Sequence, residues 1–222
     1  MFVKKKCDIC GKSSFDVLYK KNFLNIKNEE VFWSHYKKEK KKYNFQIVRC
    51  KNCNHVYSNP VFNLKNLKKL YANSHFDNTW EEKKENIEKN YFYYFEIIKN
   101  YLDKKNQILE IGSDIGLLSN ILLKNNFKKL TCIEPNKSSY IQSVKKFKKK
   151  KIKIIKDFYG EKKILKKKYD SIILIHVLDH IHDTNKFFKN LKNNLKQGGT
   201  IFIVVHDINS FMSKILKSKF PP

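Results

Sequence analysis

The sequence has almost no arginine: Arg49 is the single arginine among 47 basic residues, and the rest are lysines. Only 21 Asp and Glu residues oppose them, so the formal net charge is +26. Such an excess is typical of proteins that bind nucleic acids or anionic membranes. Phosphate and base recognition, however, favour the planar guanidinium group, which this sequence hardly uses. We therefore interpret the lysine excess as solvated surface and do not favour a nucleic-acid partner.

Long apolar runs are also missing from the sequence. No run reaches the roughly 20 residues that a membrane-spanning helix needs. Residues 1–6 lead into Cys7 without the apolar segment of a secretory signal. We therefore expect a cytoplasmic protein without a membrane span. In that reducing compartment, paired cysteines indicate a metal site and not disulfides.

Three stretches of the chain differ in character. Residues 1–62 carry two CxxC pairs and a turn-rich run, which predicts a small zinc-binding module. Residues 63–105 predict a helical linker that caps the next domain, because apolar residues recur there at three- and four-residue spacing, namely Ile87, Tyr91, Phe95, Ile98 and Leu102. Residues 106–222 form the main domain.

Short apolar runs alternate with helical patterns in this main domain. Five runs are predicted strands, namely 107–111, 130–133, 151–155, 171–175 and 200–205. The predicted helices are 117–123, 138–147 and 185–195, with a further short one over 209–217. The alternation predicts an α/β fold with a Rossmann-like parallel sheet of about five strands, covered on both faces. Ligands of such sheets bind at the carboxyl ends of the strands.

The two CxxC pairs are the first candidate site. Two such turns can complete a closed tetrahedral zinc site of four thiolates, namely Cys7, Cys10, Cys50 and Cys53, with a structural role. Gly11 and Asn54 follow the two turns and can supply the left-handed backbone that these turns require. The long gap over residues 11–49 predicts a β-rich insertion. A redox CxxC, or a site that has lost its metal, are the alternatives, and His35 and His55 are less favoured ligands.

A glycine-containing turn after the first predicted strand is the second candidate site. The strand ends in Glu110 and passes through Gly112, Ser113, Asp114 and Gly116 into a helix, so the backbone can approach a ligand where the helix amino end is positive. A dinucleotide loop would have glycine in place of Asp114, whose charge would repel a pyrophosphate. The pattern suits a nucleoside ligand without phosphates, and S-adenosylmethionine is such a ligand.

Residues after the second and third strands extend this predicted cofactor site. Glu134, which precedes Pro135, can accept hydrogen bonds from both ribose hydroxyls. Asp157 can meet the adenine amino group while Phe158 packs on the ring. Three acidic residues after three successive strands therefore predict one coherent pocket.

Residues 107–207 resemble a class I S-adenosylmethionine-dependent methyltransferase. Residues 169–181, which include His176, resemble the fourth strand of that family with its common HVLEH continuation, and residues 195–202 resemble its Gly-Gly turn and fifth strand. With the knuckle segment 49–60 in front, the chain resembles the subgroup that carries an amino-terminal zinc-binding domain. The resemblance implies S-adenosylmethionine as cofactor, with His176 in its site, and structural zinc. It also implies a small-molecule acceptor, with a sugar or surface-polysaccharide precursor as one candidate.

Histidines near the ends of the fourth and fifth strands are the candidate catalytic residues. Methyl transfer requires that the protein position the acceptor and, for a poor nucleophile, remove its proton. Because imidazole titrates near neutral pH, we expect this role for His180 first and His206 second. The alternative for His180 is a structural one, in which it orients a backbone carbonyl or caps a helix.

The sequence leaves two other functions open. The net charge and the zinc module are compatible with an RNA methyltransferase. The presence of Asp114 in the turn and the expectation of only five strands are compatible with a catalytically silent fragment or assembly subunit. A fragment, or a shortened domain whose open sheet edge a partner chain covers, would explain why the family's final antiparallel strand pair is not expected.

Overall fold

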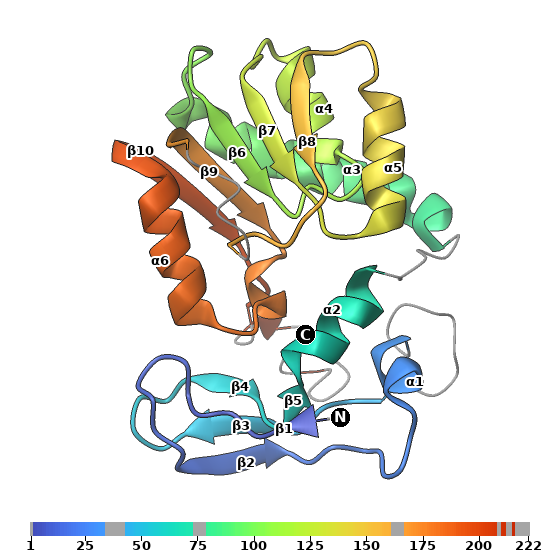
Figure 1. Cartoon of the computed structure of the whole chain (residues 1–222), viewed down its shortest axis with the longest axis vertical. Coiled ribbons are helices and arrows are strands. Elements are labelled where there is room, and N and C mark those ends of the chain that lie inside the picture. Colours follow the sequence, from blue (N-terminus) through green and yellow to red (C-terminus); the bar gives the residue numbers. More distant parts are fainter. Residues whose placement is uncertain are drawn as a thin grey trace. The chain divides into compact units, whose positions relative to one another are not determined.

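The computed structural model describes residues 2–33, 43–72, 79–160, 167–207, 210–211 and 215. Backbone contacts divide the chain into two compact units (Figure 1). Unit 1 comprises Met1–Tyr71, His182–Asn185 and His206–Pro222, and unit 2 comprises Ala72–Ile181 and Lys186–Val205. His35 and most of the helix expected over residues 209–217 lie outside the described residues. Within the described part of the chain, no helix is both long and apolar enough to cross a membrane.

Unit 2 contains the expected five-stranded parallel sheet. Its strands are β6 (Ile108–Ile111), β7 (Leu130–Ile133), β8 (Ile152–Ile155), β9 (Tyr169–Ile175) and β10 (Leu195–Val204). The order across the sheet is β10-β9-β6-β7-β8, and all four neighbouring pairs are parallel. From β6, the chain adds β7 and β8 toward one edge of the sheet. It then crosses back and adds β9 and β10 on the opposite side of β6. The carboxyl ends of β6 and β9 therefore form the switch point at which ligands of such sheets bind.

Helices cover both faces of this sheet (Figure 1). They are α3 (Thr79–Ile98) with the 3-10 turn η1 (Lys99–Tyr101), α4 (Leu117–Lys124), α5 (Lys137–Lys146) and α6 (Thr184–Asn194). Alternate strand residues point to opposite faces. Accordingly, Ile108 packs with α3 and α4, through side chains such as Phe95 and Leu122, whereas Leu109 packs with Leu191 of α6. The prediction of a sheet covered on both faces is confirmed.

The fifth strand differs from the prediction. It begins at Leu195 and not at residue 200, because Leu195 already pairs with Tyr169 of β9. The register shifts between Leu195 and Thr200, and Gly198 within this stretch has a φ of 71°. The expected Gly-Gly turn is thus an irregularity inside the strand.

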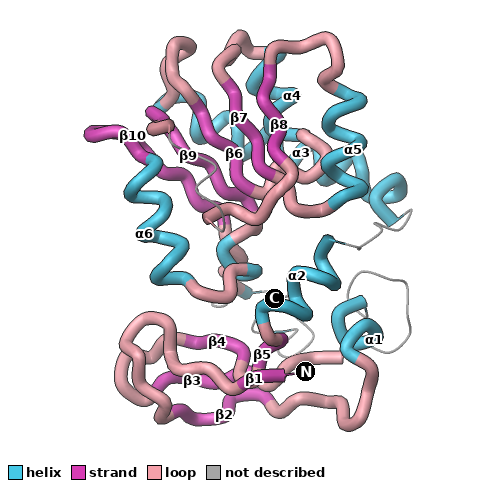
Figure 2. Tube along the Cα trace, in the orientation of Figure 1, coloured by secondary structure: helices cyan, strands magenta, loops and turns pink. Residues whose placement is uncertain are grey.

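Unit 1 consists of short strands and helices joined by loops (Figure 2). A three-stranded antiparallel sheet contains β2 (Phe15–Tyr19), β3 (Ile47–Cys50) and β4 (Val56–Ser58), and a two-stranded sheet pairs β1 (Phe2–Val3) with β5 (Val61–Phe62). The helices are α1 (Asn28–Trp33) and α2 (Leu64–Ala72). The insertion between the CxxC pairs therefore contains a helix as well as strands, so the expectation of a β-rich insertion is only partly correct.

An aromatic cluster forms the core of unit 1. Phe23, Phe32 and Phe62 are buried with Val31 and Leu70. The ring of Phe62 also lies 4.9 Å from that of Phe2, centroid to centroid. Aromatic rings bury a large apolar area per residue, which allows a small module to form a core.

Candidate functional site

Glycines shape the turn that leads from β6 into α4. Gly112 has a φ of 71° and Gly116 a φ of 74°, a left-handed backbone that side chains with a Cβ adopt at a cost. Space is limiting as well, because a Cβ at Gly112 would lie 2.5 Å from Cγ2 of Val177. A Cβ at Gly116 would meet the ring of Phe147. The turn thus uses glycine both for backbone conformation and for close packing.

Asp114 adopts the backbone conformation of the glycine that it replaces. Its φ is 47°, and its side chain turns toward α5, where Ser139 Oγ donates a 2.6 Å hydrogen bond to its carboxylate. Ser143 Oγ donates to its backbone carbonyl at 2.7 Å. Burial raises the pKa of Asp114. Aspartate is among the few residues that tolerate this left-handed conformation, so the departure from glycine is compatible with the turn.

Glu110 lies at the end of β6 and is buried, with 5% of its surface exposed. Its carboxylate accepts hydrogen bonds from the hydroxyl of Ser119 and, at 3.8 Å, from the thiol of Cys132. Burial raises the pKa of Glu110 to about 7, although these two hydrogen bonds oppose the shift. Glu110 therefore changes charge near neutral pH.

Glu134 lies directly after β7 and connects two loops of the site. One carboxylate oxygen accepts a 2.8 Å hydrogen bond from the backbone N–H of Asp114, and the other accepts one of 2.8 Å from the N–H of Asn136. Each carboxylate oxygen can accept a second hydrogen bond, so capacity for ligand hydroxyls remains. Burial raises the pKa of Glu134 to about 7.

The structure brings Glu110, Asp114 and Glu134 together, whereas the sequence predicts one pocket from Glu110, Glu134 and Asp157. The charges of Asp114 and Glu134 both act to raise the pKa of Glu110, after its burial, which is the larger cause. Within the described part of the chain, none of the three forms an ion pair. Lys146 of α5 is the nearby cation: its charge opposes the rise in the pKa of Asp114 that burial causes, and its ammonium group donates to the carbonyls of Ile115 and Gly116 at 3.4 Å. Three carboxyls near one lysine that forms an ion pair with none of them favour a positively charged ligand.

Tyr91 of α3 lies near these three carboxyls and was not predicted as a site residue. Burial raises its pKa, and the charges of Asp114, Glu110 and Glu134 raise it further. The sequence indicated Tyr91 only as part of an apolar helix face. The position of its hydroxyl depends on how α3 packs, for which the sequence carries no local signal.

The remaining predicted cofactor residues lie in the segments that follow β6, β7 and β8. Ser113 is buried, and its backbone N–H donates to the carbonyl of Ile133 at 3.2 Å. Pro135 follows Glu134 in the same loop, and both Asp157 and Phe158 are partly exposed after β8. One carboxylate oxygen of Asp157 accepts a 2.7 Å hydrogen bond from the backbone N–H of Phe158.

His176 follows β9 at the switch point, next to a second tyrosine of α3. Its φ is 52°, and its Nε2 lies 3.3 Å from the hydroxyl of Tyr94. The two rings meet nearly edge to face, with their centroids 6.0 Å apart. Tyr94 was not predicted as a site residue, yet it fixes the orientation of an imidazole at the end of a central strand.

The two candidate catalytic histidines occupy different parts of the chain. His180 ends the 3-10 turn η2 (Leu178–His180), and its Nε2 lies 3.3 Å from the carboxylate of Asp179. Its side chain is 38% exposed. His206 is exposed, follows β10 and belongs to unit 1.

The four cysteines of unit 1 form one cluster. The sulfur atoms of Cys7, Cys10, Cys50 and Cys53 all lie within 4.8 Å of one another. The sulfurs of Cys7 and Cys53 are 3.5 Å apart, and those of Cys10 and Cys50 are 3.4 Å apart. Four thiolates about 2.3 Å from a tetrahedral zinc ion would be about 3.8 Å from one another, so the donor set fits zinc.

The two CxxC turns have the same backbone geometry. The N–H of Gly11 donates to the carbonyl of Cys7 at 2.8 Å, and the N–H of Asn54 donates to that of Cys50 at 3.0 Å. Gly11 and Asn54 have φ values of 71° and 60°, as predicted. A backbone hydrogen bond from Lys12 lowers the pKa of Cys10 to about 7, whereas, against a backbone hydrogen bond from His55, burial and the other three cysteines raise the pKa of Cys53 to about 12. Metal binding requires the thiolate form of all four.

Comparisons with known proteins agree with this architecture. Residues 80–219, more than half of the chain, match the model of a protein family described as "Methyltransferase domain". A solved S-adenosylmethionine-dependent methyltransferase of Thermotoga maritima, described as a possible histamine N-methyltransferase, is similar with a TM-score of 0.50 and 17% identity. That match covers 63% of this chain and 63% of that one, and it supports the fold alone.

Two further solved structures are more distant. The glycopeptide N-methyltransferase MtfA has a TM-score of 0.43 and 13% identity over 49% of this chain, which spans half of that enzyme's length. Coclaurine N-methyltransferase has a TM-score of 0.45 and 14% identity over 51% of this chain and 34% of its own. No curated protein sequence matches the chain.

Proposed function

The chain belongs to the methyltransferase-domain family, and from this we propose that it transfers the methyl group of S-adenosylmethionine to a small-molecule acceptor. The observation that supports this cofactor most strongly is a group of three carboxyls at the carboxyl ends of β6 and β7, namely Glu110 and Glu134, which are buried, and Asp114, which is partly buried. The sulfonium and ammonium groups of S-adenosylmethionine supply the positive charge that such a group favours. A pyrophosphate would be repelled there.

Each predicted cofactor residue has a proposed role. Glu134 accepts hydrogen bonds from the ribose hydroxyls through the capacity that Asp114 and Asn136 leave unused. Asp157 meets the adenine amino group, and Phe158 packs on the adenine ring. The turn from Gly112 to Gly116 brings its backbone against the ligand, and His176, oriented by Tyr94, lies beside it.

The chain positions the acceptor and takes up its proton. When bound, the cofactor supplies an activated methyl group for in-line displacement. We propose His180 as the base that removes a proton from the acceptor, with His206 as the second candidate. The carboxylate of Asp179, 3.3 Å from Nε2 of His180, would stabilise the imidazolium that this proton transfer creates.

The four-cysteine cluster is proposed to hold a structural zinc ion. With Cys7, Cys10, Cys50 and Cys53 as ligands, the ion has no open position, so it contributes to folding and not to the methyl-transfer step. The resemblance to methyltransferases with an amino-terminal zinc-binding domain supports this role.

A sugar or surface-polysaccharide precursor is the proposed acceptor, on the resemblance to that subgroup alone. The test is to measure production of S-adenosylhomocysteine by the purified chain with a panel of nucleotide-linked sugars, and separately with RNA over a series of salt concentrations. Turnover with a sugar would support the proposal. Turnover with RNA alone, falling steeply with salt, would replace it, and cofactor binding without any turnover would favour an assembly subunit.

A further inference from the structure

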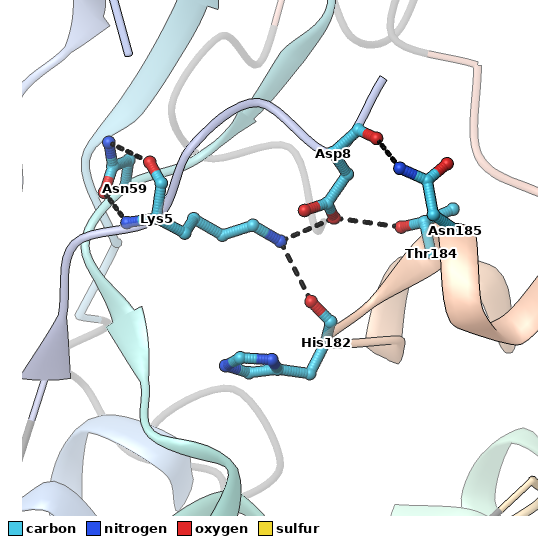
Figure 3. A network of polar contacts seen from close by, with 6 residues as sticks. All are labelled: Lys5, Asp8, Asn59, His182, Thr184 and Asn185. Atoms are coloured by element: carbon cyan, nitrogen blue, oxygen red, sulfur yellow. Dashed lines mark hydrogen bonds and ion pairs between the residues drawn. The ribbon is translucent and has the colours of Figure 1, made fainter. Parts of the chain in front are cut away.

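A polar network joins the first CxxC turn to the start of α6 (Figure 3). Asp8 lies between Cys7 and Cys10, and its carboxylate accepts a 3.0 Å hydrogen bond from the hydroxyl of Thr184, which is 176 residues away in the chain. The backbone carbonyl of Asp8 accepts a second bond from the side-chain amide of Asn185. These contacts lie within unit 1, to which residues 182–185 belong.

Lys5 extends the network on the other side of Asp8. Its ammonium group donates to the carboxylate of Asp8 at 2.6 Å and to the backbone carbonyl of His182 at 3.1 Å. The side chains of Lys5 and Asp8 are only 15% and 18% exposed. Because solvent screens this ion pair little, its geometry matters more than that of a surface pair.

The backbone of Lys5 is fixed in turn by Asn59, which follows the second CxxC turn. The N–H of Lys5 donates to the side-chain oxygen of Asn59 at 3.0 Å, and the side-chain amide of Asn59 donates back to the carbonyl of Lys5 at 3.2 Å. Asn59 is only 2% exposed, and its own carbonyl accepts a 2.8 Å hydrogen bond from Gln46. Residues beside both CxxC turns therefore hold the segment 182–185.

We propose that metal binding by the four cysteines fixes the segment His182–Asn185, and that Asp8 is the positioning residue that transmits this constraint. The inference rests on the proposed zinc site. A metal ion that joins Cys7 and Cys10 to Cys50 and Cys53 fixes the turn that carries Asp8. Asp8 and Lys5 then fix the backbone at His182 and the side chains of Thr184 and Asn185.

The location of this segment gives the constraint a functional consequence. In the chain, residues 182–185 directly follow the turn that carries Asp179 and His180, and Thr184 is the first residue of α6. The proposed constraint therefore acts on the segment that comes directly after the proposed base, His180, in the chain.

Hydrogen exchange of the intact chain tests this inference. In zinc-loaded protein, Thr184→Val removes the hydroxyl at nearly constant volume, and we expect exchange in the first two turns of α6 to become about tenfold faster or more. Thr184→Ser restores the hydroxyl and should exchange like the parent chain. Thr200→Val, the same change at an exposed position of β10, is the matched control and should have no effect on α6.

The second part of the experiment repeats the hydrogen-exchange measurement after the metal has been removed. Chelation should accelerate exchange at the start of α6 in the parent chain, and it should add less in Thr184→Val, because that variant already lacks the hydrogen bond from Thr184 to Asp8. The inference is wrong if Thr184→Val exchanges like the parent chain, or if chelation accelerates α6 equally in both proteins. Zinc content, measured separately, distinguishes failure of the metal site from failure of the connection: a chain that holds no zinc refutes both, whereas a zinc-loaded chain with unchanged exchange refutes only the connection.

Discussion

The carboxylate of Glu134 accepts a 2.8 Å hydrogen bond from the backbone N–H of Asp114. This bond joins the loop after β7 to the loop after β6. The proposed ribose-binding carboxylate is therefore held directly against the glycine-containing turn. The two loops lie next to the switch point of the sheet, where the order β10-β9-β6-β7-β8 changes direction.

Glu134→Gln should weaken binding of both S-adenosylmethionine and S-adenosylhomocysteine. The neutral amide loses charge-assisted hydrogen bonds, which contribute about 1.5–3 kcal/mol each, so we expect a roughly tenfold or greater increase in Kd by calorimetry. Glu96→Gln, on the partly exposed surface of α3, is the control and should bind like the parent chain. Unchanged affinity in a folded Glu134→Gln protein would contradict the proposed role.

The preference for S-adenosylmethionine over its demethylated product should depend on pH. Burial raises the pKa values of Glu110 and Glu134 to about 7, so both carboxyls are mostly neutral below pH 7 and mostly negative above it. Only S-adenosylmethionine carries the sulfonium charge. We therefore expect its affinity, relative to that of S-adenosylhomocysteine, to rise about three- to tenfold between pH 6 and pH 7.5. A ratio independent of pH would show that these carboxyls do not sense the sulfonium.

Gly112→Ala should destabilise the protein more than Gly198→Ala. Both glycines have a φ of 71°, but a Cβ would meet Val177 at Gly112 and nothing within 4 Å at Gly198. The backbone cost of roughly 1–2 kcal/mol is common to both, and overpacking adds about 1 kcal/mol or more at Gly112. Urea denaturation measures the difference, and Val177→Ala should recover part of it. Equal losses at the two glycines would refute the steric argument.

Cys50→Ser should abolish binding of zinc by unit 1. The closed site needs four thiolates, and loss of one lowers both metal content and the free energy of unfolding. Cys132→Ser, which changes a buried cysteine outside the cluster, should retain about one zinc ion per chain. Metal analysis after gel filtration is the measurement. If Cys50→Ser retained full zinc content, another donor set would have to hold the ion.

The sequence predicted the sheet of unit 2 well, because its strands have strong local patterns. The strand Leu130–Ile133 has the predicted bounds, and Ile108–Ile111 differs by one residue. The early start of β10 was missed, since it depends on pairing of Leu195 with Tyr169. The pairing of Phe2–Val3 with Val61–Phe62 was missed for the same reason: two-residue strands have no local signal.

The sequence indicated candidate site residues where an acidic residue lies at the end of a predicted strand, or where cysteines form a CxxC pair. Glu110, Glu134 and the four cysteines are of this kind, and the structure brings each group together. Tyr91, Tyr94 and the bond between Asp8 and Thr184 could not be predicted, because each depends on how distant segments pack. The residue type alone does not indicate a role at the site, because a tyrosine on an apolar helix face is usually interpreted as a residue of the hydrophobic core.

Calorimetric titration of the purified chain with S-adenosylmethionine and S-adenosylhomocysteine tests the central claim most directly. From the three carboxyls Glu110, Asp114 and Glu134, we expect S-adenosylmethionine and S-adenosylhomocysteine to bind at the same single site. The expected Kd is on the order of micromolar, as is usual for enzyme ligands. Absence of binding to either ligand by a folded, zinc-loaded chain would contradict the claim.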